Sequence, residues 1–165
     1  AAGSHVRVPN RLDFFHAHAL CRLGIGVLKR LNAGGGVQIE ARVMGRMAQN
    51  HIIPAALAYK TRLLNIVTQL KALYPDDFES MASTELELLK RVTKLIEEVR
   101  TKCAAMVDAR KVANKIEDEH RKAIAYHDTI APMLDTIRRQ IDKLELIVDD
   151  ALWPLPKYRE LLFIR

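Results

Sequence analysis

The stretch LELLKRVTKLIEEVRTKCAAMVDARKVANKI, residues 86–116, decides the fold. Apolar side chains follow a repeat of about 3.5 residues in it, at Leu86, Leu89, Val92, Ile96, Val99, Cys103, Met106, Ala113 and Ile116. This spacing is typical of an amphipathic α-helix. No Pro or Gly interrupts the chain between Pro75 and Pro132. The sequence therefore predicts one helix of about 45 residues, which at 1.5 Å per residue is about 68 Å long.

Such a helix is too long for a compact domain, since a chain of this size has a radius of gyration of only about 15 Å. We expect it to project, to break or to pack on a larger body. The residues Asp128–Pro132 predict the next corner, because proline is accommodated in the first turn of a helix. A second apolar stripe follows at Leu134, Ile137, Ile141, Leu144 and Val148, and Asp149–Pro156 ends it. This stripe predicts a final helix antiparallel to the first.

The residues before Ser83 predict two further helical segments. The first begins near Val37 and has one apolar face, formed by Ile39, Val43, Met47 and Ile52. Pro54 should bend or restart it, because proline lacks the backbone N–H and clashes with the preceding turn. The second has a stripe formed by Ala56, Tyr59, Leu63, Ile66, Leu70 and Leu73, and Tyr74–Asp77 is a turn signal. The sequence predicts an all-α fold, an elongated helical bundle built on a long antiparallel helical hairpin.

Residues 1–37 are predicted to be a separate unit, a vector-derived or divergent N-terminal segment with one helix. Ala1–His5 looks like an expression-vector scar. The predicted helix has its apolar positions at Leu12, Phe15, Ala19, Leu23, Val27 and Leu31. Ala33–Gly36 ends that helix and is typical of a flexible joint. Residues 38–165 form the second predicted unit.

Composition and charge narrow the classes of function. The 165 residues, 49% of them hydrophobic, suit one domain with a core. The formal net charge of +6 comes from 26 basic and 20 acidic residues. These are interleaved along the helical segments and do not form the stripe of a nucleic-acid-binding protein. No apolar run approaches the roughly 20 residues of a membrane-spanning helix. Cys21 and Cys103 lie far apart, which suits either a reducing compartment such as the cytoplasm or a protein indifferent to redox conditions. We expect neither nucleic acid nor membrane as a partner.

Candidate catalytic and metal-binding residues do not assemble into a site. A di-iron bundle needs two Glu-x-x-His pairs, whereas this chain has Glu117–His120 and only a near match at Asp13–His16. Gly34–Gly36 lacks the lysine of a phosphate-binding loop. Neither cysteine lies in a Cys-x-x-Cys pair or beside an activating base. We therefore expect no catalytic, cofactor-binding or metal-binding residue here.

The C-terminal residues predict a docking segment. Four apolar anchors, Tyr158, Leu161, Leu162 and Phe163, have little chain left to cover them, so we expect them to dock on a folded body. Trp153 stands between two acidic residues and two prolines. Two interpretations of Trp153 stay open at this point: an anchor for docking, or a cap on the helical hairpin.

The same residues carry a family resemblance. Asp142–Asp150, running into Leu152–Phe163 with its LWPLPKYRELLF motif, closely resembles the extreme C-terminus of type III glutamine synthetases. Ile39–Val43 and Asn50–Ala56 look like the start of the C-terminal helical region of that family, and Asp108–Asn114 fits its middle. The resemblance covers about residues 38–165.

The resemblance implies a non-catalytic fragment. The parent enzymes are cytoplasmic glutamate–ammonia ligases of nitrogen metabolism that make glutamine from glutamate, ammonia and ATP. Their ATP and divalent-metal ligands belong to a catalytic domain upstream, so this chain alone is expected to be inactive and without a cofactor. The partners implied are that catalytic domain and other copies in a ring-shaped homo-oligomer. The alternatives are a free-standing helical protein-binding or regulatory module and, less favoured, a bundle metalloenzyme.

Overall fold

The computed structural model describes residues 33–155, and its regular structure consists of helices alone in that range. The α-helices are α2 (Ala33–Met47), α3 (Ile53–Leu73), α4 (Phe78–Met81), α5 (Ser83–Ala113), α6 (Glu119–Ala125) and α7 (Ala131–Glu145). Two π-helical turns, η2 (Ala48–Ile52) and η3 (Tyr126–Ile130), join α2 to α3 and α6 to α7. The predicted all-α class is confirmed. None of the described helices is long and apolar enough to cross a membrane.

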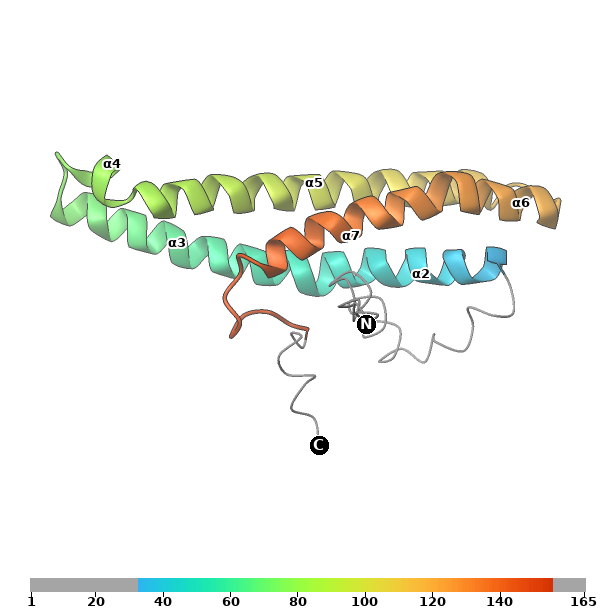
Figure 1. The fold of residues 1–165 in the computed structure, drawn as a ribbon, viewed down its shortest axis with the longest axis horizontal. Coiled ribbons are helices and arrows are strands. Elements are labelled where there is room, and N and C mark those ends of the chain that lie inside the picture. The colour runs from blue at the N-terminus through green and yellow to red at the C-terminus, as the bar shows by residue number, and fades with distance from the viewer. Residues whose placement is uncertain (1–32, 156–165) are drawn as a thin grey trace, which may run out of the picture.

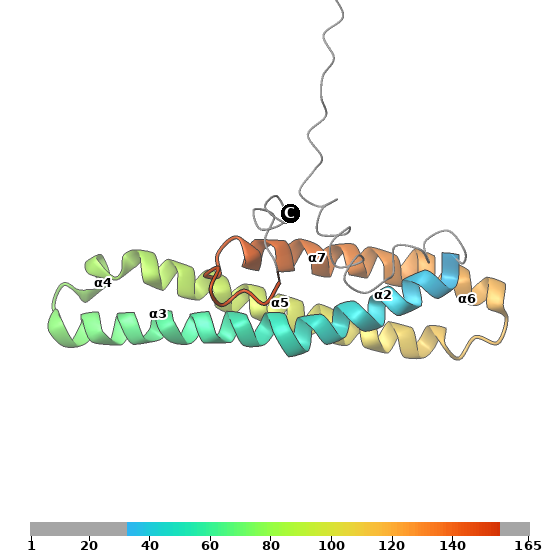
Figure 2. The same ribbon diagram turned by 90° about the horizontal axis from the view of Figure 1, so that it is seen from below.

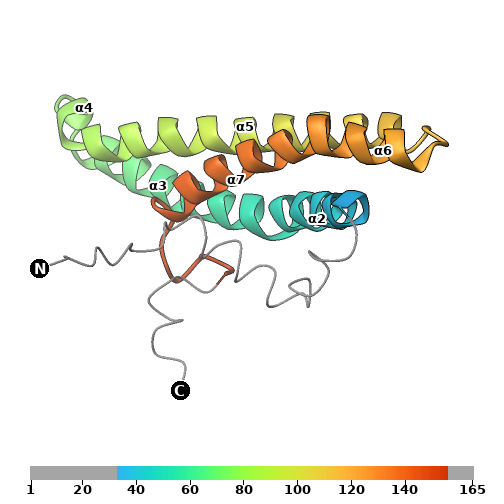
Figure 3. The same cartoon turned by 45° about the vertical axis from the view of Figure 1, so that its right-hand side comes forward.

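The helices form an elongated bundle (Figure 1). Helix α2, η2 and α3 make one rod from Ala33 to Leu73, which at 1.5 Å per residue is about 60 Å long. Helix α5 returns beside α3, and α6, η3 and α7 return along α5 (Figures 2 and 3). Helix α7 ends before the α4 end of the bundle, so only α3, α4 and α5 lie there.

The core follows the two apolar stripes that the sequence predicts for α5 and α7. The buried residues of α5 are Val92, Leu95, Ile96, Val99, Cys103, Met106 and Ala113. The buried residues of α7 are Leu134, Ile137, Ile141 and Leu144, and Val148 beyond it is also buried. No polar or charged residue between 36 and 155 is buried in this core. Apolar burial at about 25 cal/mol per Å² is therefore what holds the helices together.

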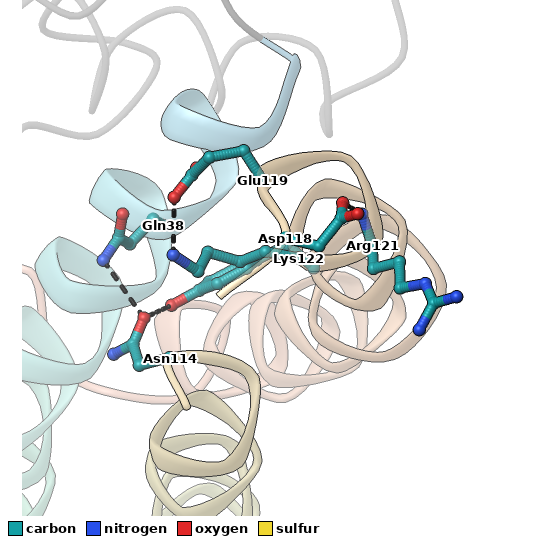
Figure 4. A network of polar contacts seen from close by, with 7 residues as sticks. Gln38, Asn114, Asp118, Glu119, Arg121 and Lys122 are labelled. Carbon is teal, nitrogen blue, oxygen red and sulfur yellow. Dashed lines mark hydrogen bonds and ion pairs between the residues drawn. The ribbon is translucent and has the colours of Figure 1, made fainter. Parts of the chain in front are cut away.

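The corner after α5 lies earlier than the sequence predicts. Helix α5 ends at Ala113, and Asp118 caps the next helix by accepting a hydrogen bond from the Arg121 N–H at 2.8 Å. The Oδ1 atom of Asn114 accepts hydrogen bonds from the Tyr126 hydroxyl at 2.7 Å and from Gln38 Nε2 at 3.4 Å (Figure 4). These bonds tie the corner to α2 and η3. The predicted 45-residue helix breaks here, which is one of the three outcomes expected for it.

The predicted corner at Asp128–Pro132 is wrong, because the helix runs through it. Pro54 and Pro132 each follow a π-helical turn by two residues. In each turn a backbone N–H bonds the carbonyl five residues back, Ile53 to Ala48 and Ala131 to Tyr126. A proline removes one helical hydrogen bond and crowds the carbonyl four residues back. A wider turn relieves that crowding and lets the rod continue.

Two predictions for the N-terminal half also need correction. Ala33–Gly36, predicted as a flexible joint, is the first turn of α2. The predicted apolar faces are partly rotated: Ile39, Ile66 and Leu73 are exposed, whereas Ala41, Met44, Ala48 and Val67 are buried. The predicted helix within residues 1–32 lies outside the described residues.

The corner network makes a testable contribution to stability. Tyr126→Phe removes the hydroxyl that donates to Asn114, and we expect the free energy of unfolding to fall by about 1 kcal/mol. Tyr74→Phe is the matched control, since Tyr74 is 47% exposed. Urea unfolding followed by circular dichroism measures both variants. Equal stability of the two variants would contradict a role for the Asn114–Tyr126 bond.

Candidate docking surface at the C-terminal turn and the distal tip

The chain leaves α7 through a turn organised by Asp149. The Asp149 carboxylate accepts a hydrogen bond from the Ala151 N–H at 2.8 Å. The Asp149 carbonyl accepts from the N–H groups of Leu152 at 3.0 Å and Trp153 at 3.1 Å. The backbone of residues 149–153 therefore closes on itself and places the Trp153 side chain.

The turn is tied to α3 by an ion pair. Arg62 Nη1 lies 3.0 Å from Asp149 Oδ2, and the two side chains are 54% and 41% exposed. A pair so open to water contributes only about 0–1 kcal/mol. Its effect is geometric, since it fixes where the C-terminal segment crosses α3.

Trp153 lies in the core of the domain. Its side chain is 7% exposed and belongs to the same buried cluster as the α5 and α7 stripes. Its Nε1 is buried and has no hydrogen-bond acceptor among the described residues. Of the two interpretations left open by the sequence, burial favours the cap, because little of the indole is left for a partner to contact. Tyr158, Leu161, Leu162 and Phe163 lie outside the described residues, so their docking role stays a prediction.

A second exposed apolar surface, which the sequence does not predict, lies at the end of the bundle that α7 does not reach. We call this surface the distal tip and define it as residues 72–89. It exposes Leu73 (71%), Tyr74 (47%) and Met81 (50%). Beside them Phe78 is half-buried, and Lys71 Nζ lies 5.6 Å from the centre of its ring. Leu73 is predicted as a core residue, and the missing third helix explains why it is exposed.

The described residues that could carry chemistry are scattered. No group of three or more His, Cys, Asp or Glu side chains between residues 36 and 155 could hold a metal ion. Glu117 and His120, the one Glu-x-x-His pair, are both exposed on the corner and on α6. Burial raises the pKa of the Cys103 thiol to about 11, so this sulfur is protonated at neutral pH. Asp13, His16 and Cys21 lie outside the described residues.

Comparison with known proteins gives matches to glutamine synthetases. Residues 35–71 match the family described as glutamine synthetase C-terminal domain. This part of the chain is similar to the C-terminal domain of glutamine synthetases. It is 40% identical over 153 residues to a glutamine synthetase of Bacteroides fragilis, and 27% identical over 133 residues to a type-3 glutamine synthetase of Dictyostelium discoideum. These matches cover 92% and 78% of this chain.

The glutamine synthetase relatives are much longer than this chain. It spans 21% of the Bacteroides protein and 18% of the Dictyostelium protein, about a fifth of their length. The Bacteroides match covers 92% of the chain, so it extends into residues 1–37 as well as 38–165. The glutamine synthetase C-terminal domain is therefore one part of proteins that contain much more.

The packing of Trp153 can be tested by mutation. Trp153→Ala should lower the free energy of unfolding by about 3–5 kcal/mol, because it leaves a large cavity in the core. Leu146→Ala is the control from the same turn, since Leu146 is 62% exposed. Trp153 is the only tryptophan, so its fluorescence also reports this turn directly. Full quenching of the folded protein by acrylamide would contradict the buried position.

The Cys103 thiol predicts a pH dependence of stability. Its pKa is about 11 in the folded chain and 9.0 ordinarily, so the folded state keeps the proton longer. The contribution of Cys103 is complete below pH 9 and is lost as the pH rises towards 11. In a Cys21→Ser background, stability should fall by roughly 2 kcal/mol more over that range with Cys103 than with Cys103→Ala. Parallel pH profiles of the two proteins would contradict this linkage.

Proposed function

We propose that this chain is the non-catalytic C-terminal helical domain of a type III glutamine synthetase, and that it docks on the catalytic domain and supports assembly of the oligomer. The observation that carries the proposal is the match of most of this chain to proteins more than four times as long. In the parent enzyme, glutamine is made from glutamate, ammonia and ATP with divalent metals. The residues for that chemistry would belong to the other four fifths, in a cytoplasmic enzyme.

The described surface supports a docking role. Large apolar side chains are exposed at both ends of the rod and on the C-terminal turn: Leu73, Tyr74, Met81, Val112, Ile124 and Leu146. The buried Trp153 holds the turn on the bundle. The apolar anchors Tyr158, Leu161, Leu162 and Phe163 follow within ten residues. We propose that Trp153 fixes the origin of this tail and that the four anchors contact another folded body.

The proposal is tested in a full-length glutamine synthetase that ends in this chain. We expect removal of residues 157–165, with Trp153 retained, to lower the mass of the assembly measured by light scattering. The KM for glutamate of the remaining active species should change less than about threefold, since the active site lies elsewhere.

Leu57→Ser is the matched control, because it removes an exposed apolar side chain (45% exposed) from α3, away from the surfaces named above. It should leave the assembly mass unchanged. If the truncated enzyme assembles to the full mass, the docking and assembly role is wrong. If assembly persists but the KM for glutamate rises steeply, the tail acts on the active site instead.

A further inference from the structure

The distal tip is apolar and acidic at the same time. Residues 72–89 contain five acidic residues and no lysine or arginine, in a chain whose net charge is +6. The acidic residues are Asp76, Asp77, Glu79, Glu85 and Glu87. None of the five makes an ion pair with another residue between 36 and 155. The same segment exposes Leu73, Tyr74 and Met81. A complementary partner is therefore basic and apolar.

The C-terminal tail has this complementary composition. Residues 157–165 read KYRELLFIR, with three basic residues, one acidic residue and five apolar residues. The four predicted anchors supply apolar area, and Lys157, Arg159 and Arg165 supply positive charge. Complementary charges speed association and favour the correct partner, while apolar contact supplies most of the affinity.

The path of the chain makes contact with its own tip unfavourable. Residues 146–155 run from the end of α7 back towards α2, away from α4 (Figures 1 and 2). The side chains of Leu152, Trp153 and Leu155 pack against the core, which fixes this direction. The ten residues that follow span at most about 35 Å when fully extended. To reach its own tip the tail would have to reverse the direction in which residues 146–155 run.

We infer that the tail of one copy, residues 157–165, docks on the distal tip of a second copy. This inference rests on the proposed assembly function and names the receptor of the tail. Tail and tip are different surfaces, so the contact is head-to-tail, and each copy gives one tail and receives another. A head-to-tail contact closes into a ring when the rotation between copies allows it.

The experiment uses the complete 165-residue chain and measures its mass by sedimentation equilibrium at increasing concentration. We expect self-association that weakens when salt is raised from about 0.05 M to about 0.5 M, because salt screens the charges. The tip variant carries Asp76→Lys and Asp77→Lys, and the tail variant carries Lys157→Glu and Arg159→Glu. Each should weaken association at least roughly tenfold, since like charges then face each other.

Two combinations show whether the tip and the tail contact each other directly. A chain carrying both the tip and the tail changes restores opposite charges and should associate nearly as well as the unmodified chain. An equimolar mixture of the two single variants should also associate, because the tip variant donates an intact tail to the intact tip of the other. Glu117→Lys is the control for charge reversal at the opposite end, and circular dichroism checks that every variant is folded.

Several outcomes would overturn the inference. The first is that the unmodified chain is monomeric at about 1 mM, a concentration at which even weak contacts form. The second is that neither the tip variant nor the tail variant changes the association. The third is that the chain carrying both sets of changes remains monomeric. None of these outcomes bears on the proposed function, which falls only if the full-length enzyme assembles normally without residues 157–165. The two ideas can therefore fail separately.

Discussion

The apolar seam along α5 is the interaction on which the rest of the structure depends. Val92, Val99 and Met106 have no exposed surface, and α5 packs against both α3 and α7. Because the buried side chains between residues 36 and 155 are apolar, the seam holds the helices together but does little to fix their register along one another. The polar corner supplies the missing register, since Asn114 bonds both η3 and α2 at one fixed position. Sliding one helix along the seam would break these bonds.

The helices continue through Pro54 and Pro132, and this continuity determines the shape of the bundle. Each lies two residues after a π-helical turn, and each turn buries two side chains: Ala48 and Ile52 in η2, Tyr126 and Ile130 in η3. The wide turns therefore belong to the core. Because α2–η2–α3 and α6–η3–α7 are each continuous, the domain is long and narrow. Its two ends lie about 60 Å apart, as given by the rise of the α2–α3 rod. A shape of this kind leaves apolar side chains exposed at its ends.

The sequence predicts the pattern of burial well and the position of the corners poorly. The stripes of α5 and α7 are correct because the apolar repeat reports the buried face directly. The predicted corner is wrong because it relies on Pro132 and not on the polar run from Asn114 to Asp118, whose Asp118 is a good helix cap. Leu73 is wrongly predicted as a core residue because periodicity shows which face is apolar, but not how far the covering helix extends. The position of Trp153 depends on the path of the chain after Asp149, and no local sequence pattern predicts that path.

The burial of Trp153 distinguishes two roles that residues of one sequence motif could have: packing within the domain and docking on a partner. The indole buries its apolar surface within the domain itself, and with the Arg62–Asp149 pair it fixes where the C-terminal segment leaves the bundle. A segment that starts from a fixed point loses less freedom when it binds than one that starts from a loose end. In the docking that we propose, Trp153 therefore contributes through its position and not through contact with the partner. The specificity of the proposed contact would then depend on the apolar and basic residues that follow Trp153 in the sequence, and on a surface that offers them apolar area and negative charge.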